Sequence, residues 1–337
     1  MAGAMILCFG ELLVRLTAPG RELLLQTGRL DVHVGGAEAN VAVGLANLGH
    51  ATACASAVPD NQLGRAAVSA IRAQGVDCGR VAVLPGRMGL YFLSPGAGLR
   101  ASDIVYDRAG SSFATAPAAS WDWDSLLAGC THLHLSGITP ALGENTADAA
   151  VAAARAARAK GLMVSFDGNY RARLWEAWDS DPRSVLTELV SCADLFFGNH
   201  RDIALLLDRP FSGDGEDRRR EAAEAAFAAF PNLKHIASTA RHVEDADCHR
   251  LAARIDTPAA GIQTAEVAVS GIVDRIGGGD AFASGVLHGL ISGRGEAVAA
   301  QWGLAVAALK HSLPGDASLF RQSDIDAFLD DVRDVRR

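Results

Sequence analysis

The chain has 337 residues, of which 31 are Lys or Arg and 39 are Asp or Glu, so its formal net charge is −8. This length can build one large α/β domain or two smaller ones. An acidic chain without a block of basic residues lacks the electrostatic footprint of a nucleic-acid-binding protein. The longest apolar run, 297–309, is shorter than the roughly 20 residues that a membrane span needs. The composition therefore predicts no nucleic-acid partner and no membrane span.

The N-terminal segment lacks the basic stretch and cleavage site of a signal peptide, and it leads directly into a strand-like run at 5–9. The six cysteines lie at least 24 residues apart, and no pair has the Cys-x-x-Cys spacing. Such spacing is typical of separate buried thiols rather than of a disulfide framework or a zinc site. These features predict a cytoplasmic protein.

The first 110 residues contain short strand-like segments separated by Gly and Pro turns. These segments are 12–18, 23–33, 81–84, 89–94 and 101–107. They interrupt the alternation of strand and helix, so we expect them to form a small accessory sheet on a larger domain. The segments assigned to it are approximately 12–33 and 81–108. No repeat or linker divides the chain, which predicts one domain over 1–337.

From about residue 130 onward, short apolar runs alternate with helical stretches, as in a mostly parallel sheet with crossover helices. The expected strands are 131–135, 162–166, 194–197 and 233–238. The expected helices are 144–160, 199–207 and 216–230. Two adjacent antiparallel strands are then expected at 250–256 and 264–270, and three further helices at 280–292, 295–311 and 323–335. The sequence therefore predicts an α/β fold.

A first glycine cluster, Gly35-Gly36, opens an apolar helix that runs to Gly49. Glycines without a Cβ let the backbone approach a ligand closely. Asn40, one turn into the helix, offers both a donor and an acceptor to a hydroxyl-rich ligand. A plain glycine turn before a helix would produce the same pattern.

A second cluster, Gly277-Gly278-Gly279, follows the strand-like pair 272–273 and precedes a helix starting near Ala281. The amides of such a loop and a helix N-terminus together form an anion site suited to phosphate. Neither the Walker loop nor the dinucleotide fingerprint is present. Asp280 next to this loop is either a helix cap or the base that takes a proton from a hydroxyl attacking a phosphoryl group.

Together, residues 35–40 and 274–280 resemble the two signatures of the ribokinase-like (PfkB) carbohydrate kinases. The resemblance covers essentially the whole chain. It implies a three-layer α/β/α domain with a mostly parallel central sheet and a small β-sheet lid, which in the family often forms a dimer interface. It also implies that Asp280 is the catalytic base and that Gly277, Gly278 and Gly279 form the anion hole.

Within that family the chain is most similar to the 2-keto-3-deoxygluconate kinases. The similarity rests on residues 35–40, 91–92, 106–108, 167–175 and 310–316. By this resemblance, the sugar-acid pocket is lined by Gly35, Gly36, Asn40, Tyr91, Tyr106, Arg108, Arg171 and Asp316. A guanidinium is the natural partner of the substrate carboxylate, so we expect the fold to bring Arg108 and Arg171 together.

The nucleotide side departs from the family pattern. Arg275 and Gly278 stand where Thr and Ala are common, which leaves dependence on a monovalent cation open. Asp202 replaces the Glu of a magnesium-linked motif and would reach Mg²⁺ through water. The residues expected to bind the ATP cofactor are Asn199, Ser238, Arg241 and Lys310.

The sequence thus predicts a Mg²⁺- and ATP-dependent kinase that phosphorylates the terminal hydroxyl of 2-keto-3-deoxygluconate or a related sugar acid. The expected partners are the sugar acid, ATP and further copies of the chain, joined through the lid sheet. Two alternatives stay open: a neutral-sugar kinase of the fructokinase or ribokinase type, and a catalytically silent sugar-acid sensor on the same fold. The gluconate and galactonate epimers are not distinguished.

Overall fold

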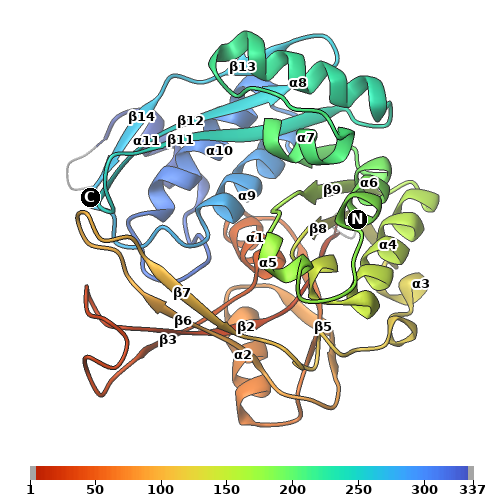
Figure 1. Cartoon of the computed structure of the whole chain (residues 1–337), viewed down its shortest axis with the longest axis vertical. Coiled ribbons are helices and arrows are strands. Elements are labelled where there is room, and N and C mark those ends of the chain that lie inside the picture. The colour runs from red at the N-terminus through yellow and green to blue at the C-terminus, as the bar shows by residue number, and fades with distance from the viewer. Residues whose placement is uncertain (1–4, 333–337) are drawn as a thin grey trace.

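The computed structural model describes residues 5–332 (Figure 1). Its central sheet has ten strands in the order β13-β12-β11-β10-β9-β8-β1-β4-β5, with β14 paired to β12. The run from β11 to β5 is parallel, whereas β12 is antiparallel to its three neighbours. The strands are β1 (Met5–Phe9), β4 (Thr52–Val58), β5 (Asp77–Val83), β8 (Cys130–Ser136), β9 (Met163–Asp167), β10 (Leu195–Phe197), β11 (His235–Val243), β12 (Cys248–Asp256), β13 (Gly261–Gln263) and β14 (Val267–Ser270).

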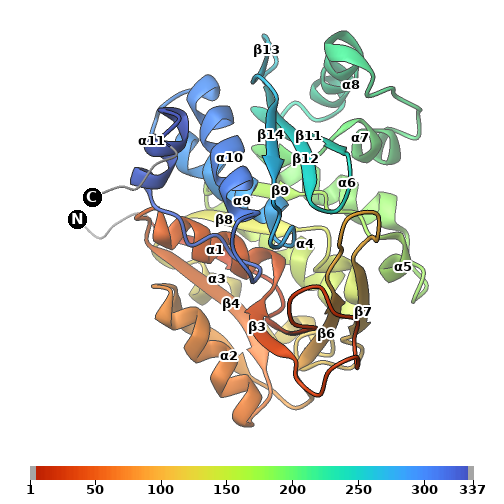
Figure 2. The same ribbon diagram turned by 90° about the vertical axis from the view of Figure 1, so that its left-hand side faces the viewer.

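Helices cover both faces of this sheet, as Figure 2 shows, and the predicted three-layer α/β/α class is confirmed. One layer contains α1 (Ala37–Asn47), α2 (Gln62–Ala73), α9 (Gly278–Ile291), α10 (Glu296–Lys310) and α11 (Gln322–Leu329). The other contains α3 (Trp123–Leu126), α4 (Glu144–Ala159), α5 (Ala172–Trp175), α6 (Pro182–Cys192), α7 (His200–Leu207) and α8 (Gly215–Ala229). Short 3₁₀ turns occupy Ala118–Ser120 and Pro140–Leu142.

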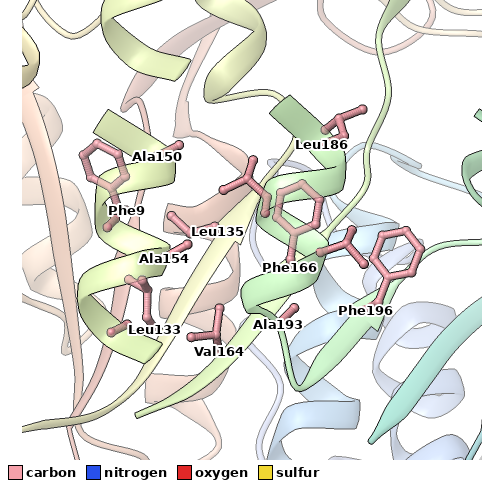
Figure 3. Close-up of a cluster of buried hydrophobic side chains, with 14 of the residues drawn as sticks. Phe9, Leu133, Leu135, Ala150, Ala154, Val164, Phe166, Leu186, Ala193 and Phe196 are labelled. Carbon is pink, nitrogen blue, oxygen red and sulfur yellow. The ribbon is translucent and has the colours of Figure 1, made fainter. Parts of the chain in front are cut away.

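Packing between the sheet and α4 illustrates how these layers form (Figure 3). Side chains of a strand alternate between the two faces, so Leu133 and Leu135 of β8 point to the same side and are fully buried. Ala150 and Ala154, one turn apart on α4, lie in the same cluster. Their small side chains let the helix approach the strands closely, which explains how an Ala-rich chain with few aromatic residues builds a dense core.

A second, four-stranded sheet, here called the accessory sheet, lies beside one end of the central sheet (Figures 1 and 2). Its order is β3-β2-β6-β7, with β2 and β6 parallel and the other pairs antiparallel. Its strands are β2 (Leu13–Thr17), β3 (Asp31–Gly35), β6 (Gly89–Ser94) and β7 (Asp103–Asp107).

The segment 81–84 was wrongly assigned to the accessory sheet, because it ends β5 at the edge of the central sheet, paired with β4. Because β5 is an edge strand, one of its sides is open to solvent and its first residues are polar. Only its apolar end was therefore recognised in the sequence as a strand. Only the end of the expected strand 23–33 is extended, as β3, and the pair 272–273 is not a strand.

Several helix and strand boundaries also differ from the expected ones, among them those of α9, of the last helix and of β11. Helix α9 begins at Gly278, so two of the clustered glycines belong to its first turn. The final helix ends at Leu329, and the last part of the expected helix 323–335 lies outside the described residues. Strand β11 extends to Val243 because β12 pairs with it along its whole length. No helix within 5–332 is long and apolar enough to cross a membrane.

Candidate active site

A cavity of about 940 Å³ opens where the central sheet, the accessory sheet and the N-terminus of α9 meet. The parallel strands β9 and β10 end here in Asp167 and in the loop that contains Asn199. Tyr91 and Tyr106 enter from the accessory sheet, and Asp280 enters from α9. Ligands of open α/β sheets bind outside the carboxyl ends of the strands, so this position is the expected one for a binding site.

The glycine loop, defined as Gly277–Gly279, forms the start of α9. Gly277 is the N-cap residue, with a φ of 76° that favours glycine. A Cβ at this residue would also collide with the main-chain oxygen of Asp316. The amides of Gly279 and Asp280 have no acceptor among the described residues. These free donors and the helix dipole give the loop the character of an anion site.

Asp280 lies in the first turn of α9 and lines the cavity. Asn40, buried in α1, donates a hydrogen bond from Nδ2 to Oδ2 of Asp280 over 2.7 Å. Burial raises the pKa of Asp280 to about 7, against the hydrogen bond from Asn40, which lowers it. A carboxylate poised near neutral pH is suited to general-base chemistry. The two sequence clusters therefore meet at one hydrogen bond.

Asp167 lies close to Asp280, and Asp202 lies close to Asp167. Burial, together with the neighbouring charges of Asp280 and Asp202, raises the pKa of Asp167 to about 8. Burial also raises the pKa of Asp202, whose Oδ2 accepts the Asn199 amide at 2.8 Å and so caps α7. Asp202 itself does not line the cavity wall, whereas Asn199 does.

The carboxylates near the cavity suit a magnesium ion that takes most of its ligands from water and from the phosphates of the nucleotide. Within residues 5–332, no three His, Cys, Asp or Glu side chains are grouped to hold a metal ion by themselves. Mg²⁺ is usually bound through one or two carboxylates plus substrate phosphates. Buried carboxylates with raised pKa values, such as Asp167, gain most from a nearby cation.

On the accessory-sheet side, Tyr91 and Asp316 are joined directly. The Tyr91 hydroxyl donates to Oδ2 of Asp316. Gly35 packs so closely against that carboxylate that a Cβ at this position would overlap it. Tyr106 lies across from Tyr91 in the sheet, with ring centroids 5.7 Å apart. Gly36, with a φ of 139°, starts α1 at the cavity wall. The structure thus brings the predicted sugar-side residues together.

Arg108 and Arg171 both line the cavity, but their surroundings differ. Arg108 is buried and donates through Nε and Nη2 to Oε2 of Glu11, with an Nε–Oε2 distance of 2.8 Å. Sequence reasoning missed Glu11, which follows β1. Arg171, at the start of α5, is exposed and has no ion pair within 5–332. Of the two arginines, Arg171 has the freer guanidinium.

Arg171, Arg241 and Arg275 form an unpaired cationic group on the cavity wall. The structure gives none of the three an ion pair with a described carboxylate. Burial lowers the pKa of Arg241, and the charges of Arg275 and Arg171 lower it further. Guanidinium groups that repel one another and have no ion-pair partner are positioned to receive an anion. Arg275 was noted in the sequence only as a departure from a motif, and that departure was the available signal.

The remaining predicted cofactor residues occupy two different positions. Ser238, on β11, lines the cavity. Lys310 does not: its side chain is 0% exposed, and Nζ donates to the main-chain oxygens of Leu313 at 3.1 Å and Asp274 at 3.4 Å. This position differs from the one expected for a nucleotide contact. Lys310 ends α10, and its charge holds loop carbonyls together.

Besides Glu11, two further buried charged residues were missed by sequence reasoning. Glu38, in the first turn of α1, accepts hydrogen bonds from Ser136 and Thr139 and lines the cavity. Arg15, in the middle of β2, pairs with Asp274 and Asp316. Glu38 lies inside the motif 35–40, whereas the only sequence signal of Arg15 is its charge within a segment expected to be an apolar strand.

Comparison with known proteins shows the family of the chain. Residues 4–321 match the model of the pfkB family carbohydrate kinases. The chain is 30% identical to the 2-dehydro-3-deoxygalactonokinase of Haloferax volcanii, covering 97% of this chain and 96% of that protein. It is 28% identical to the 2-dehydro-3-deoxygluconokinase of Bacillus subtilis, covering 91% and 90%.

Solved structures give the same result. A 2-dehydro-3-deoxygluconokinase from Thermotoga maritima superposes with a TM-score of 0.92 at 33% identity, covering 97% of this chain and 99% of the other. A PfkB family carbohydrate kinase from Listeria grayi gives 0.90 at 37% identity, covering 96% and 99%. The match spans the glycine loop, Asp280 and the accessory sheet. The chain belongs to the PfkB family of carbohydrate kinases.

Proposed function

We propose that this kinase transfers the γ-phosphoryl group of ATP to the terminal hydroxyl of a 2-keto-3-deoxy sugar acid, 2-keto-3-deoxygluconate or its galactonate epimer. The observation that carries the proposal is the arrangement around the cavity: Asp280 with a pKa near 7 stands at a glycine loop with free amides, and unpaired arginines face it. The 28–30% identity to two kinases named for such acids supports the substrate class.

In this mechanism, the sugar hydroxyl lies between Asp280 and the glycine loop. Asp280, oriented by Asn40, accepts the hydroxyl proton as the oxygen attacks phosphorus. The amides of Gly279 and Asp280 and the dipole of α9 stabilise the negative charge on the transferring group. Because these donors are fixed by the helix, they need little reorganisation during the reaction.

The cationic group formed by Arg171, Arg241 and Arg275 would meet both anionic reactants. We assign Arg171 to the sugar carboxylate, and Arg241 and Arg275, with Asn199 and Ser238, to the nucleotide side. Mg²⁺ entering with ATP would be held by the phosphates and, through water, by Asp167 or Asp202. When bound, Mg²⁺ would neutralise part of the negative charge of the phosphates.

The alternatives predict different chemistry. A neutral-sugar kinase has no need for an unpaired guanidinium such as Arg171 next to the sugar site. A silent sensor has no need for a general base whose pKa is raised to about 7. Both features favour catalysis on an acid.

A coupled assay of ADP release tests the proposal. The panel contains 2-keto-3-deoxygluconate, its galactonate epimer, 2-ketogluconate, fructose and ribose, each with Mg²⁺ and ATP. We expect kcat/KM for at least one 2-keto-3-deoxy acid to exceed that for fructose and ribose by about 100-fold or more, the range that a lost buried charge pair supplies. Equal rates on neutral sugars, or no ADP release with any acid, would contradict it.

The raised pKa of Asp280 predicts the pH dependence. Asp280 must be ionised to accept a proton, so kcat/KM should fall about tenfold per pH unit below about pH 7. A plateau is expected above that value until another group titrates. Initial rates between pH 5 and 9 in buffers of constant ionic strength measure this limb. A flat profile down to pH 5 would contradict the assignment of Asp280 as base.

The accessory sheet is proposed as a lid and as the contact between copies of the chain. Its strand register places Val32, Leu16, Phe92 and Val105 side by side across four strands, on one face. Val32 is 61% and Val105 is 50% exposed. An apolar stripe of this kind favours burial against a second copy.

Charging this stripe should therefore dissociate the oligomer. Light scattering is expected to give an oligomeric mass for the wild type and a monomeric mass for Val105→Asp. Val83→Asp is the matched control, because Val83 is at least as exposed as Val105 but lies on β5 of the central sheet. An oligomer that survives Val105→Asp, or a monomeric wild type, would refute assembly through this sheet.

A further inference from the structure

Beneath the glycine loop lies a buried charged cluster made of two cations and two carboxylates: Arg15, Lys310, Asp274 and Asp316. Arg15 is 1% exposed. It comes from β2, the strand of the accessory sheet that pairs with both β3 and β6. Its Nη2 donates to Oδ2 of Asp274, and its Nη1 lies 2.9 Å from Oδ1 of Asp316. One guanidinium therefore joins the accessory sheet to two loops of the main domain.

The first of these loops leads directly into the glycine loop. Besides binding Arg15, the carboxylate of Asp274 accepts the amide of Ile276 at 2.9 Å and the amide of Gly315 at 3.0 Å. Lys310 holds the main-chain oxygen of the same residue. Asp274 thus connects the backbone just before Gly277 to the backbone just before Asp316. Its position sets where the glycine loop starts.

The second loop carries Asp316, a residue assigned to the sugar side. Both carboxylate oxygens of Asp316 are engaged by the accessory sheet, one by Arg15 and the other by the Tyr91 hydroxyl. Its main-chain oxygen packs against Gly277 so closely that no Cβ fits there. A displacement of Asp316 would therefore displace the first residue of the glycine loop.

We propose that Arg15 is a positioning residue that couples the accessory sheet to the phosphoryl-transfer site. By bridging Asp274 and Asp316, it fixes the glycine-loop amides relative to the acceptor hydroxyl when the accessory sheet is closed over the cavity. Arg15 does not line the cavity, so it acts through these two carboxylates and not on the substrate itself. The inference rests on the proposed function only in taking the site to be one of phosphoryl transfer.

A purely structural role would make a different prediction. Removing one partner of a buried ion pair generally destabilises a protein, whatever the pair does for function. A structural residue would lower the melting temperature and leave the activity of the folded molecules unchanged. A positioning residue must also change the site while the protein stays folded.

Three variants separate these roles. Arg15→Lys keeps the charge, but a single ammonium group cannot contact both carboxylates as the two arms of the guanidinium do. Arg15→Met removes the charge. Arg87→Met is the control, because Arg87, just before β6, also pairs with an Asp, Asp107 of β7, but both partners are exposed. Thermal unfolding of each variant first establishes that it is folded at the assay temperature.

The first readout does not depend on which acceptor the enzyme uses. Calorimetry compares the affinity for Mg·ADP alone with the affinity for Mg·ADP and aluminium fluoride, which imitates the transferring phosphoryl group. For Arg15→Lys we expect the fluoride-dependent gain in affinity to fall by about tenfold or more, with ADP affinity within about threefold of the wild type. Misplacement of a catalytic group by about 1 Å costs about 100-fold, so kcat should fall by 10- to 100-fold.

The pH profile gives a second readout. Groups that set the charge environment of Asp280 are Asn40 and Glu38 on α1, Asp167 on β9, Arg171, Lys310 on α10, and Asp316. The charge of Asp316 contributes to the raised pKa of Asp280, and Arg15 is its partner. In Arg15→Met the acidic limb of kcat/KM should therefore move to higher pH. In Arg15→Lys the limb should stay in place although kcat falls.

The results described above would support the inference. Three other results would overturn it: wild-type kcat in folded Arg15→Lys, an unchanged response of that variant to aluminium fluoride, or the same losses in Arg87→Met. If the wild type phosphorylates an acceptor other than a 2-keto-3-deoxy acid, the proposed substrate is wrong, and kcat is compared on that acceptor. If it phosphorylates nothing in the panel, the fluoride measurement alone decides the role of Arg15.

Discussion

The Asp280→Asn variant should retain the fold and lose about 10²- to 10⁴-fold in kcat, the contribution expected of a general base. An amide cannot accept the hydroxyl proton, yet it has nearly the same shape as the carboxylate. KM for the sugar acid should change little, because the residues assigned to the acid are untouched. Single-turnover rates with saturating ATP give the chemical step directly.

The stability of this variant provides its control. In the folded protein the pKa of Asp280 is about 7, whereas an unperturbed aspartate in the unfolded chain titrates near about 3.9. Ionisation of this carboxylate therefore lowers the free energy of unfolding. This destabilisation is absent below about pH 4 and complete above about pH 7. Asp280→Asn should be at least as stable as the wild type at pH 8. A near-normal kcat in the folded variant would disprove the role of Asp280.

The second large effect is expected for Arg171→Met. If this guanidinium binds the substrate carboxylate, its loss should reduce kcat/KM for the sugar acid by about 100-fold, since losing one partner of a desolvated charge pair costs about 2–5 kcal/mol. Activity on fructose, which has no carboxylate, should change by less than about threefold. The measurement is the ratio of kcat/KM values for the acid and for fructose.

Arg173→Met is the matched control for this experiment, because Arg173 is also exposed and lies two residues further along, outside the cavity wall. It should behave as the wild type with both substrates. Equal losses on the acid and on fructose in Arg171→Met would refute carboxylate recognition. Arg108→Met is a weaker test, since it leaves the buried carboxylate of Glu11 without its partner.

Periodicity and turn chemistry predicted the main domain well, because its strands alternate with helices whose buried faces repeat regularly. The helix 144–160 was expected within one residue of α4. The accessory sheet was harder, because its sheet partners are distant in sequence. The end of β5 was assigned to the wrong sheet because a short apolar run such as 81–84 does not specify which sheet it joins.

For the site, the glycine clusters were informative because a backbone that closely contacts a neighbouring group requires glycine, which is visible in the sequence. Gly277 has both a positive φ and a neighbour that excludes a side chain, so the position demands glycine. The pairing of charged residues has no comparable sequence pattern. Nothing in the sequence pairs Arg108 with Glu11, or Arg15 with Asp274, 259 positions away. The function of an arginine depends on which carboxylates the fold places beside it.

The connectivity of the accessory sheet has a consequence for folding order. Its central pair joins β2 to β6, and the chain between them forms β3, α1, β4, α2 and β5. That pairing closes a long loop, so it is favourable only after the intervening segment has become compact. We therefore expect the accessory sheet to assemble after the β1–β4–β5 part of the central sheet. Early folding intermediates would hold a partly formed core and no phosphoryl-transfer site.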